Sequence, residues 1–170
     1  MKVRLKLPAA CRNPSAQDAL VSAITRPVVA EGVRLHWGAR RIPLSRGRHH
    51  GGYVCAFRGE PLVRVESALE RRVVKALAAD HCCIVLASQP VTVHWSWKGE
   101  SRRYTPDVLV MFDQLPDAWR ESGLEKVSLI EVKPLRFAVE EDLHAERVRV
   151  IRESLDMPLV RLPMAQEAQV

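Results

Sequence analysis

A single heptapeptide sets the expectation for the whole chain: Val127-Ser128-Leu129-Ile130-Glu131-Val132-Lys133. Its apolar and β-branched residues predict a buried strand, which Pro134 ends because proline has no N–H to donate. Successive side chains of a strand point to opposite faces, so Glu131 and Lys133 share one face, roughly 6.5–7 Å apart. Buried charges are costly unless they are paired or bind an ion. The stretch therefore predicts either a buried salt bridge or part of a metal-dependent site.

The flanking sequence predicts a mixed sheet between helices. Apolar residues at a 3.6-residue period predict two helices, over 66–79 and 138–155. Further strands are expected at 53–57, 62–65, 82–87, 91–97, 103–112 and 159–162, and a polar loop at 113–125. The core order is then helix, strands, helix, strand. This order is typical of an α/β fold with a mixed central sheet flanked by helices.

The first 50 residues form a basic segment. They contain ten Lys and Arg against two acidic residues, a net charge of +8, whereas residues 51–170 carry a net charge of −2. Several prolines predict an irregular course over 8–50, apart from a short strand at 34–37. Concentrated positive charge suits a polyanion such as DNA, and a solvated surface without a partner is the alternative. We expect one domain, with this basic segment at 1–50 and a core at 51–165.

The composition indicates a soluble globular protein. Of its 170 residues 47% are hydrophobic and 27% charged, which is enough for one core. The longest apolar run, 108–112, is too short to cross a bilayer, and residues 1–10 lack the apolar core of a signal peptide. We therefore expect a cytoplasmic protein with no membrane partner.

The four cysteines are expected to be reduced thiols. Cys11, Cys55, Cys82 and Cys83 show no CxxC spacing, and adjacent cysteines rarely pair with each other. A zinc site made of His81, Cys82 and Cys83 lacks a second pair of ligands at a suitable spacing. The sequence therefore gives no reason to expect zinc.

Two further acidic residues are expected to join Glu131 and Lys133. Asp107 precedes the apolar run of a strand expected beside Glu131, and Glu70 shares the apolar side of the first helix. Glu66, one helical turn earlier, is the alternative to Glu70. Neighbouring carboxylates repel each other unless a cation lies between them. A few hard oxygen ligands with room for water suit Mg²⁺, for which Mn²⁺ is an expected substitute.

These residues resemble the motif of the PD-(D/E)xK nucleases, through Pro106-Asp107 and Glu131-Val132-Lys133. A longer string is similar to the TnsA endonuclease subunit of heteromeric transposases, across about residues 33–162. The string consists of Glu66-Ser67-Ala68-Leu69-Glu70, Gln89-Pro90, Tyr104-Thr105-Pro106-Asp107 and Leu129-Ile130-Glu131-Val132-Lys133-Pro134. The resemblance implies a restriction-endonuclease-like core. It places the family's helical Glu on Glu70, its metal-binding Asp on Asp107 and its ExK pair on Glu131 and Lys133.

The resemblance also implies a function in DNA transposition. Such subunits cut the 5′ strands at transposon ends, while an integrase-type transposase cuts and joins the 3′ strands. The chain departs from the family in two respects. It stops soon after the expected core, where the family has a domain that contacts a regulatory ATPase, and it has a long loop containing Asp117-Ala118-Trp119-Arg120. Recruitment by that ATPase is therefore left open.

The expected chemistry is hydrolysis of a phosphodiester bond. Asp107, Glu131 and Glu70 would hold one or two Mg²⁺, and Lys133 would orient the attacking water or stabilise the transition state. Gln89 and Glu66 are accessory candidates. The candidates for contacts with the DNA backbone are Arg40, Arg41, Arg46, Arg48, Arg102 and Arg103. The alternatives are a restriction-type or junction-resolving nuclease of the same fold and a catalytically inactive DNA-binding adaptor.

Overall fold

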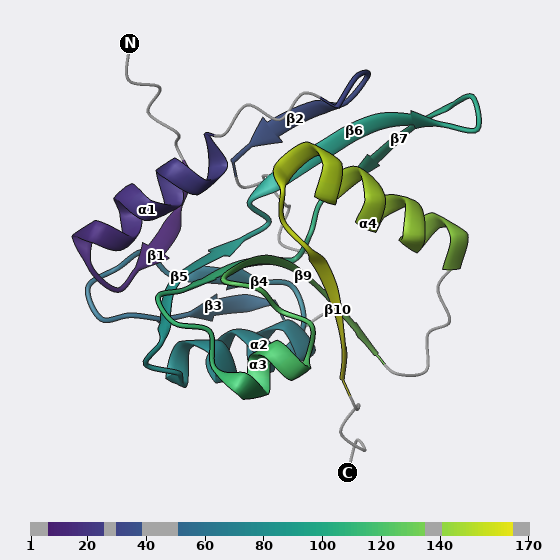
Figure 1. Ribbon diagram of the computed structural model, residues 1–170. Coiled ribbons are helices and arrows are strands. Elements are labelled where there is room, and N and C mark those ends of the chain that lie inside the picture. Colours follow the sequence, from purple (N-terminus) through teal and green to yellow (C-terminus); the bar gives the residue numbers. More distant parts are fainter. Residues whose placement is uncertain (1–6, 26–29, 39–50, 135–140, 165–170) are drawn as a thin grey trace.

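A mixed five-stranded sheet forms the centre of the protein (Figure 1). The computed structural model describes residues 7–25, 30–38, 51–134 and 141–164. The sheet has the order β1-β5-β8-β9-β10, from the strands β1 (Ala9–Cys11), β5 (Cys83–Ser88), β8 (Val108–Phe112), β9 (Val127–Pro134) and β10 (Leu159–Met164). β10 pairs with β9 in parallel, and the other neighbours pair antiparallel. The strand predicted over 127–133 is thus β9, in the interior of the sheet.

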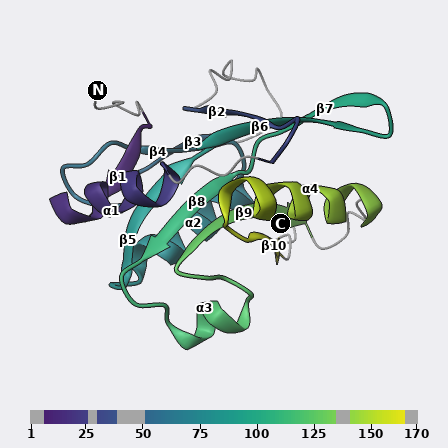
Figure 2. The ribbon, with the colours of Figure 1, turned by 45° about the horizontal axis from the view of Figure 1, so that its top comes forward.

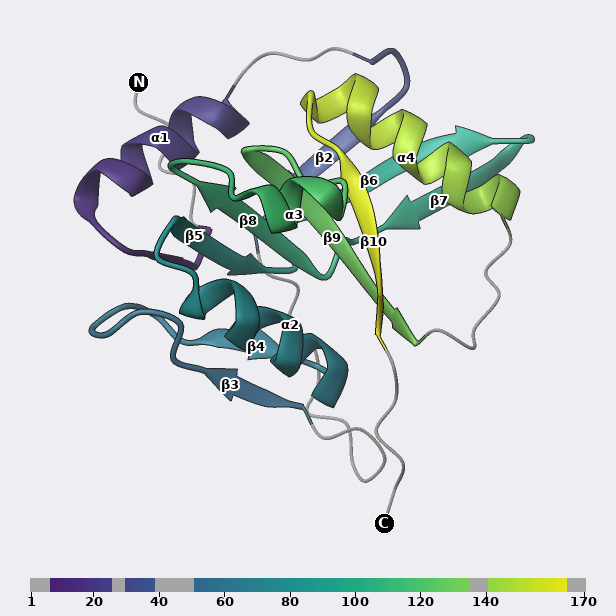
Figure 3. The same cartoon turned by 60° about the horizontal axis from the view of Figure 1, so that its bottom comes forward.

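Helices cover both faces of this sheet. They are α1 (Pro14–Ile24), α2 (Ala68–Ala79), α3 (Asp117–Glu121) and α4 (Glu141–Leu155). Leu129 of β9 packs in one apolar cluster with Ile151 of α4, whereas Ile130 packs in the other with Leu77 of α2. Because alternate residues of a strand point to opposite faces, α4 and α2 lie on opposite sides of the sheet (Figure 3). The predicted α/β fold with a mixed central sheet flanked by helices is confirmed.

Two smaller sheets complete the fold. One has the order β2-β6-β7, from β2 (Arg34–Trp37), β6 (Val91–Trp97) and β7 (Glu100–Tyr104), and the other is the hairpin of β3 (Gly52–Val54) and β4 (Val63–Val65). β6 contributes Val93 and Trp95 to the apolar cluster that contains α4, and the hairpin of β6 and β7 extends past that helix (Figure 2). The predicted short strands at 34–37 and 91–97 and the hairpin near residue 60 are confirmed.

The prediction of one continuous strand over 103–112 is wrong. The chain forms β7 and β8 there, in two different sheets, with a break at Thr105-Pro106-Asp107. Pro106 has no N–H with which to continue a ladder, so the chain turns from one sheet into the other at this point. The break lies next to β9, because Val108 at the start of β8 pairs with Ile130.

Two loop predictions are also wrong. Within the segment 8–50, β1 adds a strand to the central sheet through β5, and α1 packs Ala16, Leu20 and Ile24 into the core. The side chain of Asn13 accepts a hydrogen bond from the N–H of Ala16, and Pro14 occupies the first turn, which is a strong helix start. The predicted loop 113–125 contains the short helix α3.

The predicted helices agree with the structure. α2 begins two residues after the expected start, at Ala68, and α4 is described from Glu141, since residues 138–140 lie outside the described ranges. All four cysteines are free. None of the helices in the described ranges combines the length and the apolar character needed to cross a membrane.

Candidate active site

Asp107 lies at the break between β7 and β8 and is fixed against β9. Its N–H donates to the carbonyl oxygen of Ile130 (3.0 Å), and its Oδ2 accepts from the N–H of Val132 (2.7 Å). The side chain thus accepts a hydrogen bond from the backbone of β9 just beyond the last residue pair of β8 and β9, Val108 and Ile130. The Asp107 carboxyl group is thereby placed next to the segment that carries Glu131 and Lys133.

The environment of Asp107 disfavours its negative charge. Burial, with smaller contributions from the charges of Glu70 and Glu131, raises the pKa of the Asp107 carboxyl to about 7. The hydrogen bond from Val132 and the charge of Lys133 act in the opposite direction. The three carboxylates and the lysine are therefore close enough to interact, as the sequence predicts, although they come from α2, the β7–β8 break and β9.

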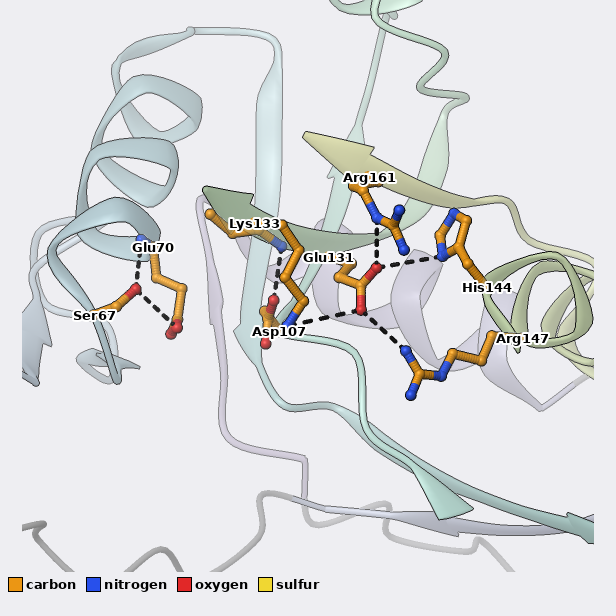
Figure 4. A network of polar contacts seen from close by, with 9 residues as sticks. Ser67, Glu70, Asp107, Glu131, Lys133, His144, Arg147 and Arg161 are labelled. Atoms are coloured by element: carbon orange, nitrogen blue, oxygen red, sulfur yellow. Dashed lines mark hydrogen bonds and ion pairs between the residues drawn. The ribbon is translucent and has the colours of Figure 1, made fainter. Parts of the chain in front are cut away.

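Glu131 is buried in the middle of β9 and is surrounded by basic groups (Figure 4). Only 1% of it is exposed. Its Oε2 accepts from Arg161 Nε at 2.9 Å and lies 3.3 Å from His144 Nδ1. Its Oε1 lies 3.5 Å from Arg147 Nη1 and 3.9 Å from Lys133 Nζ. The contacts of Oε1 are longer than those of Oε2. Replacing a basic partner of Oε1 by a metal cation would therefore cost less free energy than replacing one of Oε2.

The sequence analysis missed three of these partners: His144, Arg147 and Arg161. Arg161 lies directly opposite Glu131 in the parallel pairing of β9 and β10, a register that the sequence alone does not specify. His144 and Arg147 are three residues apart in α4 and therefore share a helix face. This spacing is the one signal that could have marked them.

Tyr104, at the end of β7, adds an aromatic group beside these residues. The Arg147 guanidinium lies 4.5 Å from the centre of its ring. Burial, followed by the charge of Glu131, raises the pKa of the Tyr104 hydroxyl well above its usual value. For His144, burial and the charge of Arg161 lower the pKa of the imidazole. Both groups are therefore neutral at pH 7, and the positive charge around Glu131 comes from Arg147, Arg161 and Lys133.

Glu70 has a structural role at the start of α2. Its N–H donates to Ser67 Oγ (3.1 Å), Ser67 Oγ donates to its Oε1 (3.0 Å), and its Oε2 accepts from the N–H of Glu66 (2.8 Å). This reciprocal arrangement is a variant of the capping box, in which Glu70 accepts from the N–H of Glu66 rather than from that of the N-cap residue Ser67. Although α2 packs on the face of the sheet opposite α4, Glu70 lies at its N-terminal end, and Asp107 stands between Glu70 and Glu131 in Figure 4. Burial raises the pKa of the Glu70 carboxyl.

Glu66 and Gln89 each have an unsatisfied side-chain oxygen. Among the described residues, Oε1 of Glu66 and Oε1 of Gln89 are buried without a hydrogen-bond donor. Gln89 has a φ of 45°, a left-handed conformation that a residue with a Cβ rarely adopts, and its N–H donates to the carbonyl of Asp107 (2.9 Å). Glu66 acts on the site through its charge, which raises the pKa of Glu70. An oxygen that lacks a donor is one that a cation could satisfy.

The set of donors fits a hard divalent cation. The hydrogen bond from Val132 goes to Oδ2 of Asp107 and not to Oδ1, and burial and acidic neighbours make the negative charge of this carboxylate unfavourable without a counter-ion. Glu70 supplies a further carboxylate on one side of Asp107, and Glu131 does so on the other (Figure 4). Oxygen ligands of this kind suit Mg²⁺ better than Zn²⁺.

The arginines expected to contact DNA are only partly described. Arg40, Arg41, Arg46 and Arg48 lie outside the described residues. Arg102 and Arg103 are in β7, where Arg102 pairs with Glu100 (2.6 Å) and lies 5.7 Å from the centre of the Trp97 ring. Arg103 is exposed. Their role toward DNA stays a prediction.

No protein-family model matches this chain, and a comparison with curated proteins gives no match. The resemblance to nucleases therefore rests on the motif residues and on the geometry described above.

Proposed function

We propose that this protein is a Mg²⁺-dependent DNA endonuclease whose site is built on Asp107, Glu131 and Lys133. One observation carries the proposal: the half-buried Asp107 lies between two other carboxylates, Glu70 and Glu131, with Lys133 close to both it and Glu131. Carboxylates gathered in this way favour a bound cation, and an adjacent ammonium can stabilise the charge that develops on a phosphate during hydrolysis.

Each residue has a distinct part in the proposed reaction. Mg²⁺, when bound, polarises the scissile phosphate and lowers the pKa of a coordinated water. Asp107 is oriented by the N–H of Val132, which leaves its other oxygen for the ion. Lys133 is 39% exposed, so its ammonium can reach a phosphate oxygen or an attacking water while remaining near Glu131. Arg161 holds Glu131 in place through Oε2, which leaves Oε1 for exchange.

Double-stranded DNA at transposon ends is the proposed substrate, and an integrase-type transposase is the proposed partner. This part of the proposal rests on the resemblance of residues 66–70, 89–90, 104–107 and 129–134 to TnsA subunits. The basic N-terminal segment supports a polyanionic partner. A restriction-type or junction-resolving nuclease would use the same site on other DNA. An inactive adaptor would have no need for the metal ligands.

The test compares Asp107→Ala and Lys133→Ala with the wild type. We expect Mg²⁺ to raise the melting temperature of the wild type and of Lys133→Ala, because an ammonium is not a ligand, but not that of Asp107→Ala. Both variants should lose nicking of plasmids that carry transposon ends, measured with and without the partner transposase. Glu121→Ala, an exposed acidic residue of α3, is the control and should behave as the wild type.

Stability separates this proposal from a purely structural salt bridge. Lys133 is partly exposed and 3.9 Å from Glu131, so Lys133→Ala should cost only about 0–1 kcal/mol of unfolding free energy. A large loss, of about 3–5 kcal/mol, would indicate that the lysine is a structural partner of a buried charge. The proposal fails if the wild type shows no Mg²⁺-dependent shift and Asp107→Ala still nicks DNA.

A further inference from the structure

Three side chains of types that can bind metal ions lie close together at the turn between α2 and β5. Asp80, His81 and Cys82 each offer a ligand atom, and these atoms all lie within 4.8 Å of one another. His81 Nε2 and Cys82 Sγ are 3.4 Å apart. Two such ligands of a tetrahedral zinc ion, with Zn–S and Zn–N distances of about 2.3 and 2.0–2.1 Å, lie about 3.5 Å apart. The spacing is therefore already that of two ligands of one ion.

The carboxylate of Asp80 is held in position from two sides. Its Oδ1 accepts from the N–H of Cys82 (2.9 Å), and its Oδ2 accepts from Trp119 Nε1 (3.0 Å), which belongs to α3. Each oxygen retains a second lone pair that can bind a metal. Hydrogen bonds of this kind orient the ligands of metal sites.

The structure groups a different set of residues from the His81, Cys82 and Cys83 considered from the sequence. Cys83 is fully buried and packs in the apolar cluster that contains α2. Cys82 is only partly buried, and its neighbour His81 is exposed. The set that comes together is thus Asp80, His81 and Cys82, which the sequence analysis did not consider.

The surroundings of these three residues leave room for a cation. They line a cavity of about 630 Å³ together with residues 114–117 and Arg120. The cavity is therefore large enough for an ion and the water that would complete its coordination.

We propose that Asp80, His81 and Cys82 bind Zn²⁺ or a similar borderline-soft divalent cation, with the fourth position open to the cavity. On binding, the Cys82 thiol loses its proton to solvent and its sulfur becomes a ligand. A sulfur and an imidazole nitrogen select against Mg²⁺, so the site is chemically distinct from the one around Asp107. Through Asp80 and Trp119, the ion would join the α2–β5 turn to α3.

The test uses the full chain, without DNA or Mg²⁺. Co²⁺ replaces Zn²⁺ as a coloured probe, and we expect a thiolate-to-cobalt charge-transfer band, one ion per chain and displacement by Zn²⁺. Calorimetry in buffers of different ionisation enthalpy should register proton release on Zn²⁺ binding. Cys82→Ser should abolish the band, and both it and His81→Ala should weaken Zn²⁺ binding at least about tenfold.

Cys55→Ser is the matched control, because Cys55 is an exposed free cysteine remote in sequence from this turn. It should leave the band and the affinity unchanged. A wild type without the band, a band lost in Cys55→Ser, or an unaltered Zn²⁺ affinity in Cys82→Ser would each overturn the proposal. Because no nuclease activity is measured, this outcome is independent of the function proposed above.

Discussion

Asp107 is the residue whose charge the fold tolerates poorly, since its pKa is raised to about 7. In an unfolded chain an aspartate titrates near 3.9. The folded state therefore binds the proton more tightly than the unfolded state does. By linkage, this residue contributes stability at low pH that is lost as the pH rises from about 4 to about 7. Above that window the loss is complete.

Asp107→Asn should remove this pH dependence. The amide oxygen can still accept the hydrogen bond from Val132, and only the charge is lost. In metal-free buffer, the free energy of unfolding of the variant relative to that of the wild type should rise by about 1–3 kcal/mol between pH 5 and pH 8. This range follows from roughly 1.4 kcal/mol per pKa unit, reduced because Asp107 is partly exposed. Urea unfolding at the two pH values measures it. Glu121→Gln is the control, and an equal change in both variants would contradict the explanation.

At the scale of elements, the start of α2 combines a helix cap with a candidate metal ligand. Ser67→Ala removes the cap and should cost about 1 kcal/mol. Glu70→Gln keeps an oxygen that can accept from the N–H of Glu66 but removes the charge, so it should cost only a few tenths of a kcal/mol. If Glu70 is a ligand, Glu70→Gln should nevertheless lose most of the Mg²⁺-dependent rise in melting temperature.

Thermal melts with and without Mg²⁺ distinguish these two roles. Ser67→Ala should have a lower melting temperature than the wild type but retain the Mg²⁺-dependent shift. Glu70→Gln should have nearly the melting temperature of the metal-free wild type but lose most of that shift. A full shift in Glu70→Gln would exclude Glu70 as the helical ligand. Glu66, whose Oε1 is buried without a donor among the described residues, would then be the residue to substitute.

Helices and strands with a clear apolar period could be predicted from the sequence. The breaks and connections between them could not. Val73, Val74 and Leu77 reveal α2 by their period, and β9 follows from its apolar residues and Pro134. The break at Pro106 is visible in the sequence, but the apolar run on its far side favoured one long strand. The sequence prediction does not include α1, although Asn13 and Pro14 mark its start. The prolines of this segment favour a prediction of irregular structure.

The candidate site shows the same limit. Asp107, Glu131 and Lys133 were predictable from their motif and from strand alternation. The closest partner of Glu131, Arg161, was not, because it depends on parallel pairing with a strand 30 residues later. The sequence Ser67-Ala68-Leu69-Glu70 indicates the capping role of Glu70, because this pattern fits a capping box as well as it fits a nuclease motif.

At the scale of the whole molecule, charge is distributed unevenly along the chain. The basic segment at 1–50 carries +8 and the remainder −2. If Arg46 and Arg48, which lie outside the described residues, contact phosphates, their replacement by Ala should weaken DNA binding equally for all sequences. The log–log slope of affinity against salt should flatten by roughly 0.9 for each lost contact.

Fluorescence anisotropy over a range of salt concentrations measures that slope. Arg149→Ala is the control, because its guanidinium already binds Glu146 (2.8 Å) and Glu153 (2.5 Å) on the surface of α4. It should leave the slope unchanged. An unchanged slope in the double variant of Arg46 and Arg48 would show that their charge is only solvated.

The pairing of Glu131 with Arg161 also has a consequence for the order of events during translation. Glu131 is translated 30 residues before its closest counter-charge, and a carboxylate enclosed in a protein without a partner is costly. At about 5–20 residues per second, the ribosome needs a few seconds to supply that arginine. During this interval only the longer contacts, with Lys133 and Arg147, are available to Glu131. The charge environment of Glu131 is therefore complete only once β10 has been made.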